Sequence, residues 1–231
     1  MITKIQLLLS ASGEGQINQI TDQLALEWTR IKETSPDARH RLAVRVPGDP
    51  TASVPQDGQP DEVPEQPSFD VVFEIRGENL SFDALCESVE GIGERLGPAV
   101  DVHSSAALVG TEHEIVSGSE RLFLNMVLRR LPEWGRANWQ AHWIDHHAAE
   151  VRENVSGLQG YRQFHADENA SMAAAKSAGL AIHDYEGTAE GYYSDIDKFL
   201  ETLSDPEVQK DTGFIDHGRS VMWLYILQDS D

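Results

Sequence analysis

The order of strand-like and helix-like segments is the feature that most constrains this chain. Alternating apolar residues predict strands, and apolar residues three or four positions apart predict helices. Strands are expected at 2–10, 39–46, 69–76 and 100–116, and again at 121–130, 158–165, 185–193 and 221–228. Helices are expected at 17–33 and 81–96, then at 132–152 and 194–203, with a short helix or turn at 170–178. The order strand, helix, strand, strand, helix, strand therefore occurs twice.

A βαββαβ order is typical of a ferredoxin-like unit, and its recurrence in 231 residues indicates an internal repeat. One such unit leaves a whole face of its sheet uncovered, and pairing two units buries both faces. We therefore predict an α+β fold of tandem ferredoxin-like units that form a barrel within one chain. The two halves are expected at residues 1–118 and 119–231.

Residues 47–68 form an interruption in the first half. They contain six of the ten prolines, several acidic residues and no Lys or Arg. Because this composition buries very little apolar surface, the segment is predicted to be an extended or disordered loop. A lid over a site is the alternative interpretation.

The net charge of the chain excludes several kinds of partner. Lys and Arg number 18 against 39 Asp and Glu, a formal charge of −21. Nucleic acid and anionic membrane surfaces need a basic face, so neither is expected as a partner. Cys86 is the single cysteine, so neither an intrachain disulfide nor a cysteine zinc cluster is possible. The N-terminus is patterned as a strand, no apolar run reaches the ~20 residues of a membrane span, and a cytoplasmic protein is expected.

Aromatic and histidine residues concentrate in the predicted helix at 132–152. Trp139, Trp143 and His147 lie four positions apart and share a helix face. A neighbouring stripe holds His142, His146 and Glu150, in which two histidines at i and i+4 are compatible with a shared metal ion. The sequence supplies no clear further ligand, so no metal is predicted.

A second cluster lies on the predicted strand at 158–165. Tyr161, Gln163 and His165 alternate to one face, and Phe164 points to the other. A histidine from the helix and a histidine or tyrosine from this strand, if they converge in an apolar cleft, can serve as general acid and base. The alternative is that the tryptophans are core and the histidines are amphipathic surface residues.

The second half resembles the EthD-like family of the dimeric α+β barrel superfamily. The matching pieces, in order, are Leu128-Arg129-Arg130, Pro132, His142-Trp143, His147, residues 160–165, residues 184–190, Pro206-Glu207 and residues 214–216. The first half matches only in strand and helix order. The resemblance implies a ferredoxin-like barrel, with relatives in degradative pathways and among polyketide dehydratases, and it leaves a homodimer open.

The function predicted from these features is a cofactor-independent lyase, dehydratase or cyclase that acts on a hydrophobic, aromatic small molecule. His147 is the expected acid or base, with His165, Tyr161 and His142 as further catalytic candidates. Substrate contacts are expected from Trp139, Trp143, Gln163 and Phe164. Two alternatives remain: a non-catalytic binding protein of a degradation pathway, and a haem-binding or cofactor-free monooxygenase barrel.

Overall fold

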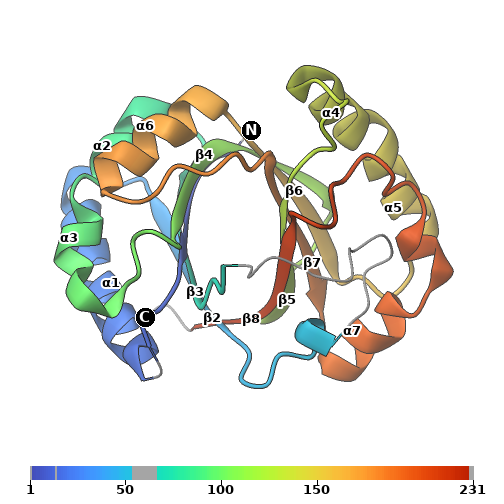
Figure 1. Cartoon of the computed structure of the whole chain (residues 1–231), viewed down its shortest axis with the longest axis horizontal. Helices are drawn as coiled ribbons and strands as arrows, with labels where there is room; N and C mark the ends of the chain where they lie inside the picture. Colours follow the sequence, from blue (N-terminus) through green and yellow to red (C-terminus); the bar gives the residue numbers. More distant parts are fainter. Residues whose placement is uncertain (1, 14, 54–66, 229–231) are drawn as a thin grey trace.

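Eight antiparallel strands close into a barrel in the computed structural model, which describes residues 2–13, 15–53 and 67–228 (Figure 1). The strands are β1 (Ile2–Leu9), β2 (Arg39–Arg45), β3 (Val71–Gly77), β4 (Ala106–Val116), β5 (Leu122–Leu128), β6 (Gly160–Ala166), β7 (Gly187–Tyr193) and β8 (Val221–Leu227). Their order around the barrel is β1-β3-β2-β8-β5-β7-β6-β4. The predicted α+β barrel is therefore confirmed.

Each half contributes one continuous block of four strands. Within each block the strands lie in the order fourth, first, third, second. The blocks join at two seams, where β2 pairs with β8 (Val44 opposite Ile226) and β4 pairs with β6 (Thr111 opposite His165). Hydrogen bonding at both seams removes every free sheet edge from the barrel.

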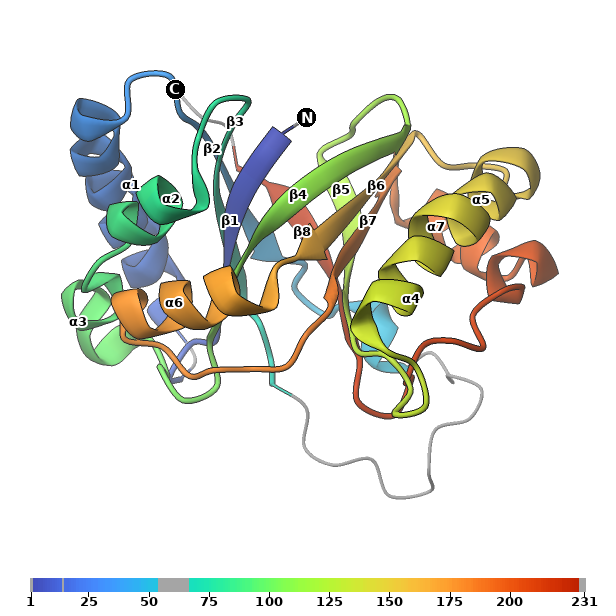
Figure 2. The ribbon, with the colours of Figure 1, turned by 90° about the horizontal axis from the view of Figure 1, so that it is seen from above.

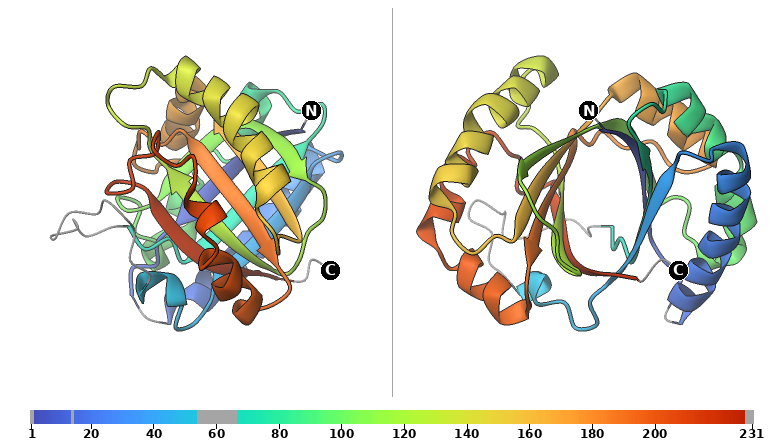
Figure 3. Two further views of the ribbon diagram at one scale, coloured as in Figure 1. Left: turned by 90° about the vertical axis from the view of Figure 1, so that its right-hand side faces the viewer. Right: turned by 180° about the vertical axis from the view of Figure 1, so that it is seen from behind.

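The helices lie outside the barrel in two groups (Figure 3). They are α1 (Gln16–Thr34), α2 (Phe82–Ser88), α3 (Ile92–Leu96), α4 (Arg136–His142), the π-helix η3 (Trp143–His147), α5 (Ala148–Asn154), α6 (Glu168–Ala178) and α7 (Ile196–Leu203). Short 3₁₀ segments cover Pro50–Ser53, Gly97–Ala99 and Pro206–Gln209. No helix of the described residues is long and apolar enough to span a bilayer.

Helix α6 comes from the second half of the chain but covers the first half of the barrel. Figure 2 shows it running beside α2 and α3, over β4. Its buried face carries the small residues Ala174, Ala175 and Ala178, which belong to the same apolar core as α1. Small side chains permit close helix packing. Gly93 of α3 lies so near the backbone of Ala178 that a Cβ added to Gly93 would lie 2.8 Å from Ala178 O.

Two predicted elements of the first half differ in the structure. The helix expected at 81–96 is two helices, because Gly91 adopts a left-handed φ of 66° and donates its N–H to Ser177 O at 2.7 Å. The strand expected from residue 100 begins at Ala106. Asp101 instead forms a turn in which its carboxylate accepts hydrogen bonds from His103 N and Ser104 Oγ.

The predicted loop at 47–68 is ordered where the structure describes it. Its residues 50–53 form a 3₁₀ turn that packs on β8, Thr51 is buried, and Asp49 Oδ2 accepts a hydrogen bond from Leu224 N at 2.7 Å. The remainder, 54–66, lies outside the described residues. The start of this segment is therefore part of the fold.

A buried ionic cluster occupies one level of the barrel interior. Lys4 Nζ lies 2.7, 2.9 and 2.6 Å from carboxylate oxygens of Glu74, Glu112 and Glu190. Arg41 adds contacts of 3.0 Å to Glu74 and 2.9 Å to Glu190. Burial alone would lower the pKa of Lys4, but the three carboxylates raise it overall. The cluster ties strands of the first half to β7 of the second.

Candidate functional site

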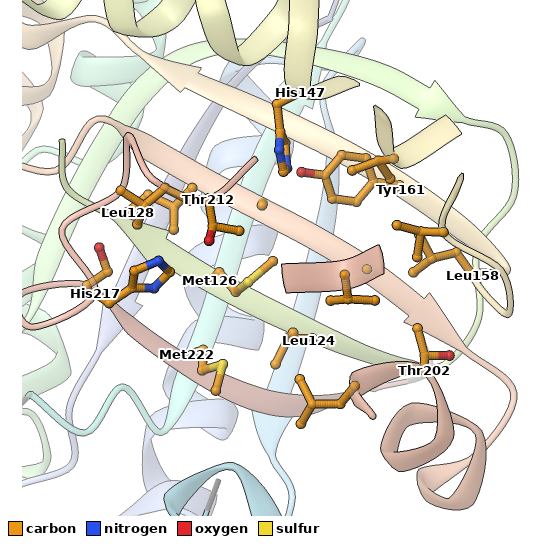
Figure 4. A pocket seen from close by; sticks show the side chains of 18 of the residues that line it. Leu124, Met126, Leu128, His147, Leu158, Tyr161, Thr202, Thr212, His217 and Met222 are labelled. Atoms are coloured by element: carbon orange, nitrogen blue, oxygen red, sulfur yellow. The ribbon is translucent and has the colours of Figure 1, made fainter. Parts of the chain in front are cut away.

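A cavity of about 130 Å³ lies between the outer face of the second half's sheet and the helices that cover it (Figure 4). Its lining comes from β5–β8, η3, α5, α7 and the segment before β8. Most of the lining side chains are apolar. A dry engineered cavity of about 150 Å³ takes a benzene molecule, so this cavity is of the size that holds about one small ring.

Strand alternation explains the floor of the cavity. Leu124, Met126 and Leu128 of β5 point outward toward the helices, as every second residue must. On β7 the corresponding positions include Ala189 and Gly191. These two small residues leave space where larger side chains would meet the helices.

A π-helical turn positions the cavity's upper wall. In η3 the Ala148 N–H donates to Trp143 O, five residues back, and Gln163 Nε2 donates to the same carbonyl at 2.9 Å. Residues four apart lie close to one helix face, and Trp143 and His147 both face the sheet. The helix expected at 132–152 thus begins at Arg136 and contains an irregular turn over Trp143–His147.

His147 is presented to the cavity as a neutral base. Its Nδ1 lies 3.1 Å from Asp211 O, and a carbonyl oxygen can only accept, so Nδ1 carries the proton. The other ring nitrogen, Nε2, then holds a lone pair, and Figure 4 shows the ring pointing into the cavity. Burial lowers the pKa of His147, although Asp211 opposes this effect.

Tyr161 of β6 supplies a protonated hydroxyl beside this base. The residue is 4% exposed and burial raises its pKa to about 12. Its hydroxyl group points toward the ring of His147 in Figure 4. A neutral imidazole and a phenol therefore share one apolar cavity, and groups of these two kinds can act as general base and general acid.

His165 lies apart from this pair. Its ring stacks on Trp143 with centroids 4.4 Å apart and planes at 11°, and its Nε2 lies 3.1 Å from Gln163 Oε1. It does not line the cavity as the described residues define it. Burial lowers the pKa of His165 to about 3, with a further contribution from His113. The shared strand face with Tyr161 was predicted correctly, but Trp143 covers the His165 end of that face.

This environment predicts a stability effect of His165 in acid. The pKa of His165 is about 3 in the folded protein and about 6.5 in the unfolded chain. Between these pH values only the unfolded chain binds the proton, so His165 lowers the free energy of unfolding as the pH drops from 6.5 toward 3. One proton taken up on unfolding corresponds to about 1.4 kcal/mol per pH unit. We expect His165→Gln to remove about that slope from the free energy of urea unfolding between pH 6 and 4. The same change at exposed His103 is the control, and equal slopes in both variants would contradict the assignment.

The other predicted site residues fall outside the cavity lining. Trp139 is buried, with Nε1 donating to Phe214 O at 2.9 Å. Gln163 joins the helix to the sheet, because its Nε2 donates a hydrogen bond to Trp143 O. Phe164 points into the barrel, where its ring centroid lies 4.8 Å from Lys4 Nζ. His142 faces an open groove and bonds to Asp211 Oδ1 at 3.0 Å. Of the eight predicted residues, the cavity brings together His147, Tyr161 and Trp143.

Four polar residues of the cavity were not predicted. Figure 4 shows Thr202, Thr212 and His217 around its rim, and Ser220 also lines it. All come from α7 or the irregular segment before β8, where no periodic pattern singles out individual positions. The sequence pattern that came nearest to them is residues 214–216, a piece of the EthD-like resemblance that ends directly before His217.

These residues form neither a metal site nor a haem site. Among the described residues, no group of three or more His, Cys, Asp and Glu side chains could hold a metal ion, and the stripe of His142, His146 and Glu150 lines an open groove. His147 Nε2 is chemically suited to haem iron. The cavity, however, has room for one ring and not for a macrocycle of four pyrroles, so the residues present do not fit haem.

Comparisons with known proteins agree with the predicted resemblance. Residues 131–218 match the family model described as EthD domain. No curated protein matches the chain. Similar solved structures are an anthrone oxidase-like protein (TM-score 0.58, 11% identity, 99% of this chain and 91% of that one) and a putative chlorite dismutase (0.51, 12%, 99% and 95%). A putative monooxygenase from Lactobacillus acidophilus NCFM is also similar (0.50, 8%, 98% and 93%). At these identities the likeness shows the barrel fold alone.

Proposed function

We propose, from the premise that residues 131–218 are an EthD domain, that the cavity binds a hydrophobic, ring-containing small molecule and transfers protons on it without a cofactor. The favoured reaction is that of a dehydratase, cyclase or related lyase. The observation that carries the proposal is the neutral His147 imidazole beside the protonated Tyr161 hydroxyl, both inside apolar walls.

In the proposed reaction one proton moves from the substrate to His147 and then back to the substrate. His147 Nε2 takes a proton from a carbon next to a carbonyl group, or from a phenol, and becomes an imidazolium. The Tyr161 hydroxyl donates a hydrogen bond to the oxygen on which negative charge develops. In an elimination, the imidazolium then gives the proton to the leaving hydroxyl, which departs as water as the C–O bond breaks. In a ring closure, the carbanion attacks a second carbonyl carbon of the substrate, and the imidazolium gives the proton to the alkoxide that this forms. Either route restores the neutral enzyme.

A cofactor-free oxygenase is the second candidate. One similar structure is named an anthrone oxidase-like protein, and another is named a putative monooxygenase. The same base would deprotonate an activated ring carbon, after which molecular oxygen would react with the carbanion. Oxygen consumption separates this reaction from a lyase reaction.

The repeat also supports a finer description of the scaffold. We infer that each half, 1–118 and 119–231, is a ferredoxin-like unit. The recurring order fourth, first, third, second supports this division. In that arrangement the second unit carries the site.

The experiment that tests the proposal blocks the cavity. We expect phenols and aryl ketones from a screened panel to bind and, for the true class, to be converted. Ala189→Leu adds three carbons to the floor of the cavity and should weaken this binding at least tenfold, because the space admits one ring. The matched control is Ala25→Leu on the exposed face of α1. Isothermal titration calorimetry and product analysis, with and without oxygen, are the measurements.

Four outcomes are informative. Turnover without oxygen supports the lyase, and turnover that consumes oxygen supports the oxygenase. Tight binding with no conversion identifies a carrier and contradicts the proposed catalysis. Equal binding by the Ala189→Leu and wild-type proteins would show that the ligand lies elsewhere.

A further inference from the structure

Asp211 contacts two histidines of one helical segment. Its carboxylate Oδ1 lies 3.0 Å from His142 Nε2, and its carbonyl oxygen lies 3.1 Å from His147 Nδ1. Its second carboxylate oxygen, Oδ2, is buried, has no hydrogen-bond partner among the described residues and lies 3.6 Å from His147 Nδ1. The residue therefore stands between the cavity on the His147 side and the more open groove on the His142 side.

The backbone of Asp211 is unusual as well. Its φ of 52° is the one positive value at a non-glycine residue in the described part of the chain. Aspartate tolerates this left-handed conformation better than most residues do. The conformation places the carbonyl and the carboxylate of one residue on the same imidazole. Such sparsely populated conformations cluster at functional sites.

We propose that Asp211 is the positioning residue of His147: its carbonyl oxygen fixes the tautomer of the ring, and its carboxylate stabilises the imidazolium that forms during proton transfer. This inference rests on the proposed role of His147 as the base. It also assigns a role to His142, which does not line the cavity: His142 holds the Asp211 carboxylate in place from the solvent side.

The electrostatics around His147 agree with this role. The groups that face it are the carboxylate and carbonyl of Asp211, His142, the hydroxyl of Tyr161 and, across the cavity, His217. The neighbouring Lys210 is exposed and paired with Glu207. Asp211 is therefore the anionic group that acts on the ring, and it opposes the burial that would otherwise disfavour the imidazolium.

The test is a histidine titration by ¹H–¹⁵N NMR on the full-length protein, with the His147 signals assigned from a His147→Gln spectrum. Asp211→Asn retains the shape and removes the charge. Asp211→Gly retains the left-handed backbone and the carbonyl group and removes the carboxylate. We expect the wild-type ring to be the Nδ1–H tautomer, both variants to keep that tautomer, and both to lower the pKa of His147 by about one unit. Asp145→Asn removes the same charge from the same groove and should change nothing.

The results that overturn the inference are independent of catalysis. A wild-type Nε2–H tautomer, an unchanged pKa in both Asp211 variants, or an equal shift in Asp145→Asn would each reject it. Because the titration needs no substrate, the absence of turnover would reject the proposed function alone. With a converted substrate, the acid limb of the pH profile of kcat/KM should move to lower pH in both Asp211 variants, by the same amount as the pKa of His147. In these variants kcat should fall while KM stays constant.

Discussion

We expect His147→Ala to lower turnover of a converted substrate by about 10²–10⁴-fold, the usual contribution of a general acid or base. The reason is geometric: His147 Nε2 is the unprotonated nitrogen that faces the cavity, since Nδ1 donates to Asp211 O. The measurement is steady-state kinetics, with circular dichroism to confirm the fold. His146→Ala changes the same residue type one position earlier, on the exposed side of the helix, and should retain activity.

Two results would count against this assignment. Equal losses in His146→Ala and His147→Ala would indicate a general effect on the helix. Loss of folding in His147→Ala would indicate that the ring is structural. His147→Asn then serves as the decisive variant, because its amide nitrogen takes the place of Nδ1 and can still donate to Asp211 O. Full activity of that variant would exclude His147 as the base.

The largest expected effect on stability is at Lys4. Lys4→Met removes the cation that three buried carboxylates share and should lower the free energy of urea unfolding by about 3–5 kcal/mol, as breaking a buried ion pair does. Lys198→Met is the control. Lys198 pairs with Glu201 on the surface of α7, where an ion pair contributes about 0–1 kcal/mol. A similar small loss in both variants would show that Arg41 alone compensates the cluster.

The pH range of this effect follows from the direction of each shift. The pKa of Glu190 is lowered, mainly by Arg41 and Lys4 acting against burial, so its contribution is present above about pH 4.3 and lost in stronger acid. The pKa of Lys4 is raised, so its contribution is present below about pH 10.4 and lost in stronger base. In the wild-type protein the contribution of Lys4 and Glu190 should therefore be constant between about pH 5 and 10.

Local patterns in the sequence predicted most strands and helices and the barrel. Periodicity reports which face of an element a residue occupies. Along β1, alternation puts Lys4 and Gln6 on the face opposite Ile5 and Leu7, a mixed face because Leu8 shares it. It does not report what that face meets. Only barrel closure, through pairs as distant as Ala43 and Leu227, turns the mixed face of β1 into a sealed interior. The ionic cluster was missed for that reason.

The lining of the cavity was predicted in part for a similar reason. His147 and Tyr161 line it, and each belongs to a regular element whose face the spacing defines. His165 shares the face of Tyr161, but the crossing of the helix over β6 lays Trp143 on it. Asp211 and His217 sit in irregular chain, where position depends on long-range contacts such as Asp211 with His142. No short-range pattern encodes those contacts.

The two seams of the barrel have a consequence for synthesis. When the ribosome has made only the first half, β2 and β4 are the outer strands of a four-stranded sheet, and their partners β8 and β6 do not yet exist. Helix α6, which covers part of that half, is also still to come. Exposed strand edges invite pairing with other chains. The nascent chain thus exposes the unpaired edges of β2 and β4 until β6 and β8 have been made. We therefore expect chaperones to bind it during translation and the barrel to close in a slow, late step.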